Sequence, residues 1–564
     1  MAFFLKKQKQ NNKTYLHIYE SFYSPDTKNT KHHFIRSLGS VESLSAKGID
    51  DPLSFCQAEV DKLNAERNKD KVKLISDVSP VIHLGYFPLA AIMNKLQISK
   101  YVDFFDLSTD FDFRLFDILS SLVYARAVNP CSKHRTYCEV LPNLYGCYDF
   151  SYDQLLEGLA FLGNDYEKFI ELFNTQVNRF YKLDTSTTYF DCTNFYFEID
   201  REDDFRKKGP SKENRRDPIV GMGLLLDKNQ IPCGLKLYPG NESEKPVIRE
   251  VITALKARNE ITGRTIQVAD KGLNCAQNIF FARKNGDGYI FSKSVRMLPE
   301  TEITWVLLNR DFKEIKDKNG KLLFKYKECT DKFPYTYTDD SGSKYTFELT
   351  EKRVVTYNPS LAIKQKAEIN KLVEKAKDLQ LSQAKKSEYG ESAKYVKFSS
   401  TSKGEITDEK VSVTINQKTI DKDMSLAGYN LLVTSEINMP ALDIYHVYHN
   451  LWRIEESFRI MKSDLDARPV YLQKRETIQG HFLICYVTVL LQRILQFHIL
   501  KNKYSSSDIN SFFKKFNAVK SDNGYINLLR SSDFVRDLVA LTGLPINHYS
   551  LNDTKIKTVF SYKF

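Results

Sequence analysis

Residues 187–197 read TTYFDCTNFYF, and this stretch decides the fold. Its β-branched and aromatic residues predict a buried strand. Asp191 stands inside the run, where an acid is costly unless it is paired or bound to a metal ion. For Asp191 alone two interpretations stay open: it belongs to a functional site, or it caps a turn at the end of the strand.

A second acid follows a second predicted strand. Residues 266–270 read IQVAD, which places Asp270 at the carboxyl end of a short apolar run, directly before a turn and a predicted helix. Two acids carried by strands suggest one shared site.

A third acid lies on a predicted helix. Residues 448–465 read YHNLWRIEESFRIMKSDL, and their apolar residues recur with helical spacing over a broad face. Tyr448, Glu455 and Lys462 are each seven residues apart, so they drift by only about 20° per step and form one stripe. The alternative is an exposed helix face on which Glu455 pairs with Arg459.

Together the three acids indicate metal-dependent chemistry. Two-metal phosphoryl transfer needs carboxylates from separate segments to hold two divalent ions ~3.5–4 Å apart. Without cations the clustered acids would repel one another, whereas Mg²⁺ lets all three stay ionised. We therefore expect Asp191, Asp270 and Glu455 to be both the metal ligands and the catalytic residues.

Composition supports a multidomain globular protein. The 564 residues are 42% hydrophobic and 27% charged, which excludes wholesale disorder. Lys and Arg number 82 against 71 Asp and Glu, a net charge of +11 that favours a polyanionic partner only if it is concentrated on one face.

The cysteines and apolar runs favour a cytoplasmic location. Nine scattered cysteines without a Cys-x-x-Cys pair predict neither a disulfide framework nor a common zinc site. Cys131, His134, Cys138 and Cys147 are spaced irregularly, so packing cysteines are expected rather than zinc ligands. The most apolar stretch, 477–492, contains Gln, His and Thr and predicts a buried core helix, so we expect no membrane partner.

The pattern along the chain predicts six segments. Residues 1–75 alternate as a small β-rich module with a connector, 76–183 are helical, and 184–295 mix short strands with helices. Residues 296–435 resemble a β-rich insertion, 436–500 return to the core with the acid-bearing helix, and 501–564 form a helical tail. The first two segments are the candidates for DNA binding, although neither shows a clear helix-turn-helix pattern.

These residues resemble the insertion-sequence DDE transposases, in the branch with a Tyr-x2-Arg-x3-Glu-x6-Lys signature. Tyr448, Glu455 and Lys462 match the signature, and Leu451 stands where it has Arg. Arg453 is the nearby arginine that could replace that phosphate contact. Further matching stretches are YFDCTNFYFE, GPSKENRRDP, LYPGNESE, VADKGL and RPVYLQKRETIQGHFLICY.

The resemblance implies an α/β fold: a ribonuclease-H-like catalytic core interrupted by the β-rich insertion. It implies a DNA transposase that uses two Mg²⁺ or Mn²⁺ ions to cut insertion-sequence ends and join the 3′ hydroxyl to target DNA. The implied partners are double-stranded DNA, at terminal inverted repeats and target, and a second copy of the chain in a synaptic homodimer. The implied location is the nucleoid of a prokaryotic cytoplasm. Two alternatives stay open: a metal-dependent nuclease that does not join strands, and a non-catalytic DNA-binding derivative.

Several further side chains are candidates for DNA contacts. Tyr448 and Lys462 would touch the phosphate near the cleaved end, and Arg453 and Arg459 share their helix. The loop GPSKENRRD supplies Lys212, Arg215 and Arg216, although a solvated hairpin loop explains these charges equally well. Trp305 could stack on an unpaired base, but a core tryptophan is the default.

Overall fold

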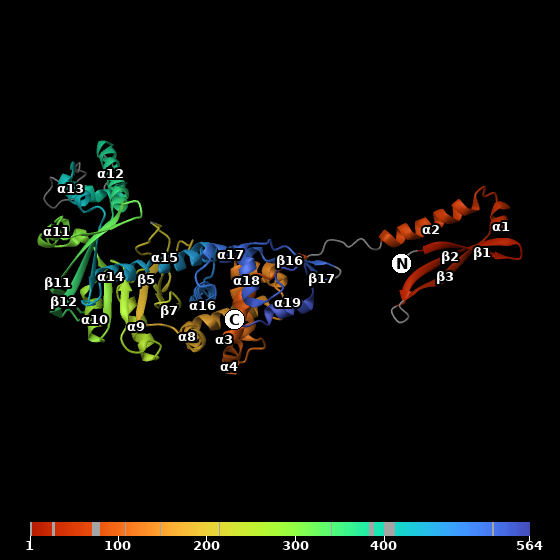
Figure 1. The fold of residues 1–564 in the computed structure, drawn as a ribbon, viewed down its shortest axis with the longest axis horizontal. Helices are drawn as coiled ribbons and strands as arrows, with labels where there is room; N and C mark the ends of the chain where they lie inside the picture. The colour runs from red at the N-terminus through yellow and green to blue at the C-terminus, as the bar shows by residue number, and fades with distance from the viewer. Residues whose placement is uncertain are drawn as a thin grey trace. The chain divides into compact units, whose positions relative to one another are not determined.

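The structure is a computed structural model, and its two compact units are Met1–Ser79 and Pro80–Phe564 (Figure 1). It describes residues 3–24, 29–69, 79–107, 109–146, 148–213, 215–339, 341–382, 388–399, 412–521 and 524–564. Cys147 lies outside the described residues.

The first unit is a three-stranded antiparallel sheet with two helices. Strands β1 (Phe3–Gln10), β2 (Lys13–Ser24) and β3 (Asn29–Ser40) pair in that order. Helices α1 (Val41–Ser45) and α2 (Pro52–Lys69) follow, and Leu16, Leu44 and Cys56 form a small core between sheet and helices. The predicted N-terminal β module is confirmed.

The second unit is built around a nine-stranded mixed sheet in the order β10-β11-β12-β15-β9-β8-β5-β6-β7. Strand β8 pairs in parallel with both β5 and β9, and every other neighbouring pair is antiparallel. The strands are β5 (Thr187–Tyr196), β6 (Ile219–Leu226), β7 (Pro232–Pro239), β8 (Ile266–Ala269), β9 (Gly288–Lys293), β10 (Lys313–Lys316), β11 (Leu322–Thr338), β12 (Lys344–Tyr357) and β15 (Tyr429–Thr434).

Both faces of this sheet carry helices, because successive side chains of each strand point to opposite sides. On one face, Phe190, Cys192 and Ala269 join the core of α9 (Val247–Ala257) and α10 (Ala276–Lys284). On the other, Tyr189 and Val268 belong to the core of α14 (Ala441–His449), α15 (Trp452–Arg459) and α16 (Arg475–Arg493).

The expected insertion extends the same sheet instead of forming a separate one. Strand β15 pairs with β9 on one side and with β12 on the other, so β10, β11 and β12 continue the sheet outward. Beside them lie α11 (Glu300–Leu307), α12 (Pro359–Leu381), α13 (Gln417–Leu426) and the two-stranded sheet of β13 (Val396–Ser399) and β14 (Ser412–Ile415).

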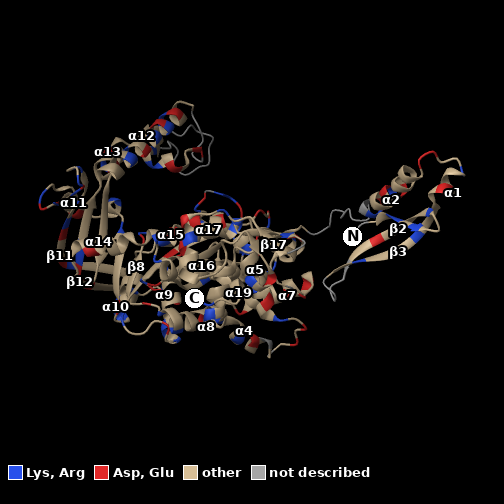
Figure 2. Ribbon diagram, turned by 45° about the vertical axis from the view of Figure 1, so that its right-hand side comes forward, with Lys and Arg blue, Asp and Glu red and all other residues tan. Residues whose placement is uncertain are grey.

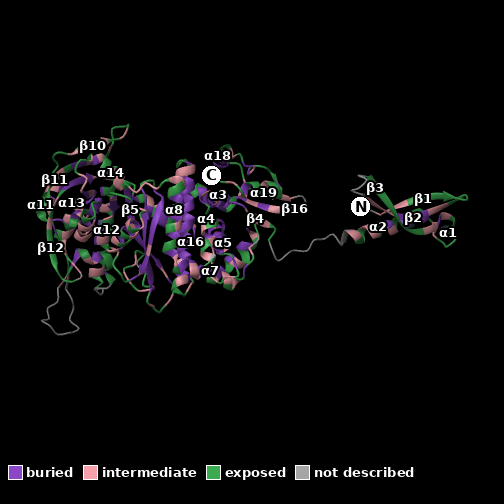
Figure 3. Cartoon of the chain, turned by 90° about the horizontal axis from the view of Figure 1, so that it is seen from below, coloured by how far each residue is buried: buried purple, intermediate pink, exposed green. Residues whose placement is uncertain are grey.

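The predicted helices between 84 and 183 are present, and they share one core with α16. They are α3 (Phe87–Leu96), α4 (Ile98–Asp106), α5 (Leu115–Val128), α6 (Lys133–Arg135), α7 (Tyr152–Asn164) and α8 (Tyr166–Tyr181). Figure 3 shows α8 and α16 largely buried. The segment Arg475–Ile499 is long and apolar enough to cross a membrane, but 83% of its most apolar window is buried inside the protein, as a core helix would be.

The C-terminal tail is mixed rather than helical, which corrects the sequence prediction. Helices α17 (Ser506–Lys515), α18 (Asp533–Thr542) and α19 (Asp553–Phe560) alternate with β16 (Asn517–Ser521), β17 (Gly524–Asn527) and β18 (Ser550–Leu551). These strands form a four-stranded sheet with β4 (Val81–His83). Their partner lies more than 400 residues away in the chain, and local periodicity carries no sign of such a pairing.

Two glycines allow helices α7 and α16 to pack closely against each other. A Cβ on Gly163 would lie 1.7 Å from the Glu476 carbonyl oxygen, and one on Gly480 would lie 2.2 Å from the Leu159 carbonyl oxygen. We expect Gly163→Ala to lower the free energy of unfolding by about 3 kcal/mol, because the helices must separate to admit the methyl group. Urea denaturation followed by circular dichroism measures the change.

The matched control is Gly272→Ala, whose new Cβ would meet no atom within 4 Å. Equal stability of the two variants would show that the helices do not meet at this distance.

Candidate active site

Asp191 and Asp270 lie side by side because β5 and β8 are parallel and in register. Phe190 is opposite Ala269, so the next residue on each strand is an acid. Alternation along the strands turns both carboxylates toward α14 and α15, on the side of Tyr189 and Val268. The structure thus brings the two predicted strand acids together.

The surroundings of Asp191 disfavour its charge. Burial raises the pKa of Asp191 to about 6, the charges of Asp270 and Glu244 add to the rise, and Lys212 opposes it. Its Oδ1 accepts a hydrogen bond from the Cys192 backbone N–H at 2.8 Å. Two partly buried acids lie together here, and their surroundings disfavour the charged form of Asp191. A bound cation would stabilise that charged form.

Tyr448 connects the helical face to the acids. Its hydroxyl donates a hydrogen bond of 3.1 Å to Asp270 Oδ1. Burial raises the pKa of Tyr448 well above its ordinary value, and the charge of Asp270 adds to the rise. The phenol therefore stays protonated and holds Asp270 in position.

The predicted acid-bearing helix is interrupted. It consists of α14, α15 and a π-helical turn, η6 (Ile460–Asp464), with a tightened turn between α14 and α15. There the Leu451 N–H bonds to the Tyr448 carbonyl and the Ile454 N–H to the Leu451 carbonyl, both at 3.0 Å and both three residues apart. The predicted stripe is therefore not carried by one regular helix.

Glu455 has an exposed side chain on α15. Across the residues that the structure describes, no group of three or more His, Cys, Asp or Glu side chains lies close enough to hold a metal ion. Asp191 and Asp270 supply oxygen donors of the kind that Mg²⁺ prefers. Glu455 as the third ligand stays a prediction.

Basic side chains lie next to Asp191. Lys462 on η6 has its pKa lowered to about 8, by burial first and then by Lys212, while Asp191 acts in the opposite direction. Lys212 donates to the Cys192 carbonyl and lies 3.4 Å from Glu244. Lys462 and Lys212, both predicted to contact DNA, therefore lie beside the first acid.

An acid pairs with Lys462 in the structure. Glu213 lies 3.4 Å from Lys462 Nζ and forms a second ion pair with Arg468. Two cations that hold a carboxylate have the charge and the donors to hold a phosphate as well. Glu213 and Arg468 were not among the predicted site residues, although Arg468 opens the motif RPVYLQKRETIQGHFLICY.

The remaining arginines of the loop 209–217 face other partners. Arg215 stacks on the Tyr196 ring, with 3.8 Å from guanidinium to ring centroid, and pairs with Asp217 at 3.2 Å. Arg216 is exposed. These two stay predictions as DNA contacts.

Arg453, Arg459 and Trp305 make their contacts elsewhere. Arg453 stacks on Trp452 and pairs with Glu456 at 3.1 Å, and Arg459 donates to Ser506 Oγ at 3.1 Å. Trp305 packs against the insertion's core, and its carbonyl accepts a hydrogen bond from Lys327. None of these contacts involves the two strand acids.

Arg493 holds the acid-bearing helix in place, and sequence reasoning missed it because it lies at the end of an apolar helix. Its fully buried side chain forms an ion pair of 3.1 Å with Glu456 and donates to Ser457 Oγ and to the Arg453 carbonyl. Three groups of α15 are thus bound to one side chain of α16, which limits how α15 moves.

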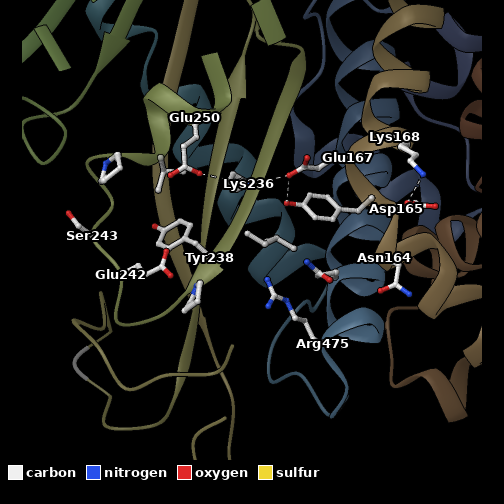
Figure 4. A pocket seen from close by; sticks show the side chains of 16 residues that line it. Asn164, Asp165, Glu167, Lys168, Lys236, Tyr238, Glu242, Ser243, Glu250 and Arg475 are labelled. Atoms are coloured by element: carbon white, nitrogen blue, oxygen red, sulfur yellow. Dashed lines mark hydrogen bonds and ion pairs between the residues drawn. The ribbon is translucent and has the colours of Figure 1, made fainter. Parts of the chain in front are cut away.

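A cavity of about 680 Å³ lies at the β7 edge of the sheet, lined by β7, the α7–α8 junction and the start of α16 (Figure 4). Its charges pair with one another: Lys236 lies 3.2 Å from Glu167 and 3.8 Å from Glu250. Neither Asp191 nor Asp270 lines it. The cavity is therefore separate from the pair of strand acids.

Comparison with known protein families gives one match. The family model described as the transposase DDE domain matches residues 188–491, more than half of the chain, and this range contains Asp191, Asp270 and Glu455. No curated protein matches the sequence. The chain belongs to the transposase DDE domain family, which implies a catalytic DNA transposase and a ribonuclease-H-like core.

Removing the Arg493 contact should destabilise the protein and reduce its activity. Arg493→Met leaves Glu456 largely buried with one cation fewer, so we expect about 3 kcal/mol less stability in denaturant unfolding. Arg135→Met is the matched control, because it breaks the exposed pair Arg135–Glu139 and should cost less than about 1 kcal/mol. Equal losses would contradict a special role for the buried pair.

Neutralising Glu213 should strengthen DNA binding. Glu213→Gln removes a negative charge from Lys462 and Arg468, so we expect the Kd for duplex DNA to fall about three- to tenfold at low salt, with a smaller difference at high salt. Fluorescence anisotropy measures the Kd. Glu157→Gln, an exposed acid on α7, is the control, and weaker binding by Glu213→Gln would refute the expectation.

Proposed function

We propose that this DDE-family protein cuts the ends of an insertion sequence and joins the freed 3′ hydroxyl to target DNA by two-metal-ion phosphoryl transfer. The observation that carries the proposal is the pair Asp191 and Asp270, adjacent at parallel strands and facing α14 and η6, which supply Tyr448 and Lys462. The family match supports the same reaction class.

Proteins with this domain generally use divalent metal ions. We propose that Asp191 and Asp270 hold Mg²⁺ or Mn²⁺, and that Glu455 completes the ligand set when DNA and cations are bound. Two such ions activate the attacking water or hydroxyl and stabilise the leaving oxygen. The exposed position of Glu455 leaves its carboxylate without a competing partner among the contacts that the structure describes.

The protein's own side chains position the substrate. Lys462 and Lys212 stand beside Asp191 as cations that can hold the phosphate next to the cleaved bond. For this, Glu213 must leave Lys462 and Glu244 must leave Lys212. Tyr448 fixes Asp270 through its hydroxyl. Arg215 and Arg216 extend the basic loop along the DNA backbone.

The partners proposed are the transposon's terminal inverted repeats, the target DNA and a second copy of the chain in a synaptic homodimer. Cleavage at two ends with coordinated joining favours one active chain for each end.

Removing either strand acid should abolish the reaction. Metal ions supply several kcal/mol of transition-state stabilisation, and each 1.36 kcal/mol is a factor of ten in rate. We therefore expect Asp191→Asn, Asp270→Asn and Glu455→Gln each to lower the rate of end cleavage by ~100-fold or more. The assay uses a labelled duplex that carries the sequence bordering the gene, with Mg²⁺.

Asp443→Asn is the matched control, because Asp443 is an exposed acid on α14. Full cleavage by Glu455→Gln would remove that residue from the ligand set. Cleavage by the wild type without joining of precut ends would identify a nuclease instead of a transposase.

A further inference from the structure

The three-stranded sheet of the first unit has one face that no described element of that unit covers. Along β2, Leu16 and Ile18 are fully buried toward the helices, whereas Tyr15, His17 and Tyr19 point the other way and stay partly exposed. The register places Phe4 opposite Tyr19, Lys6 opposite His17, and Tyr19 opposite Phe34. The sheet face, as named here, consists of Phe4, Lys6, Tyr15, His17, Tyr19, His32 and Phe34.

Aromatic rings dominate this sheet face. Phe4 meets His32 edge-on with ring centroids 4.9 Å apart, and Phe34 meets Tyr19 in the same way at 5.6 Å. Phe34 is 47% exposed, which is high for a ring held in such a cluster. A sheet that serves only to cover its own helices does not need a second, aromatic face.

The strands of the first unit are mainly basic, whereas nearly all of its described acids lie on or beside the helices. The three strands contain one acid, Glu20, which pairs with Arg67 of α2. They carry six basic residues: Lys6, Lys7, Lys9, Lys13, Lys31 and Arg36. The described acids of the rest of the unit lie on or beside the helices: Glu42, Asp50, Asp51, Glu59, Asp61 and Glu66.

Two exposed lysines lie on the aromatic side of the sheet: Lys6 on β1, and Lys13 on β2, which is two residues before Tyr15 and so points the same way. The register places Lys7 opposite Leu16 and Lys31 opposite Phe22, so these two side chains point toward the helical side. Figure 2 shows the basic residues along these strands, and Figure 3 shows β1 and much of β3 exposed. An aromatic face that carries lysines and no acid complements a groove between two phosphate backbones.

The size of the sheet agrees with the major groove. Three strands spaced by about 4.8 Å span roughly 10 Å, and the major groove of B-DNA is about 12 Å wide. Strands are known to read bases in this groove, where the donor and acceptor pattern differs for each base pair.

The helices between 84 and 183 are less suited to reading bases in the major groove. Twelve of the residues of α5 are buried, and α7 packs closely against α16 through Gly163 and Gly480. Their faces serve the core of the second unit.

We propose that the sheet face of the first unit docks in the major groove of double-stranded DNA and recognises the transposon end. Lys6 and Lys13 contact phosphates, while His17 and Phe34 face the bases. That the bound sequence is a transposon end rests on the proposed function; that the sheet binds duplex DNA does not.

The test uses the full chain and fluorescence anisotropy with two duplexes, one carrying the sequence bordering the gene and one with that sequence scrambled. Lys6→Gln/Lys13→Gln should weaken binding to both duplexes at least tenfold. It should also lower the slope of log K against log salt by about 1.8, since each phosphate contact contributes ~0.9. Lys47→Gln/Lys62→Gln, two exposed lysines on the helical side, is the control and should change neither quantity.

A second variant tests base recognition. His17→Ala/Phe34→Ser should keep the salt slope and reduce the preference for the end sequence over the scrambled one by about tenfold. Unchanged affinity and preference in both variants, or equal affinity for single-stranded DNA of the same sequence, would overturn the proposal. Circular dichroism of each variant confirms that a loss of binding is not a loss of folding.

The two proposals fail separately. A wild-type chain that cuts and joins DNA while both sheet variants bind normally refutes the docking surface alone. A wild-type chain that neither cuts nor joins, while the sheet variants lose duplex binding, refutes the proposed reaction alone.

Discussion

The parallel pairing of β5 with β8 is the constraint on which the site depends. It places two carboxylates on adjacent strands, at the same level and on the same face, although 79 positions separate them in the chain. Burial raises the pKa of Asp191 to about 6, and the charge of Asp270 adds to the rise. A bound cation would favour the charged form of this acid, which supports the metal site proposed at the pair.

The other face of the site is built by helices anchored in the same core. Arg493 on α16 holds α15 through Glu456, Ser457 and the Arg453 carbonyl, and Tyr448 on α14 holds Asp270. The helices between 84 and 183 share a core with α16, and so they support the helix that holds α15. The first unit has its own small core, and we propose it as the part that recognises DNA.

Local pattern was enough to predict the strands that carry Asp191 and Asp270 and the helical nature of the Tyr448–Lys462 region. It could not predict which strands pair: β15 joins β9 across about 140 residues, and β4 joins β16 across more than 400. Arg493 was hidden because an arginine at the end of an apolar helix suggests solvent, whereas here it is fully buried against Glu456. Packing determines the tightened turn between α14 and α15 and the π-helical turn that follows α15. The seven-residue spacing of Tyr448, Glu455 and Lys462 is regular and gave no sign of either turn.

The central claim is that Asp191, Asp270 and Glu455 converge on divalent cations. A crystal structure of the full chain bound to transposon-end DNA and Mn²⁺ tests it most directly. An anomalous difference map locates the manganese ions. The account predicts anomalous peaks bridged by Asp191 and Asp270, with a Glu455 carboxylate oxygen within ~2.2 Å of one of them. Manganese bound elsewhere, or bound by the two aspartates while Glu455 points into solvent, would contradict it.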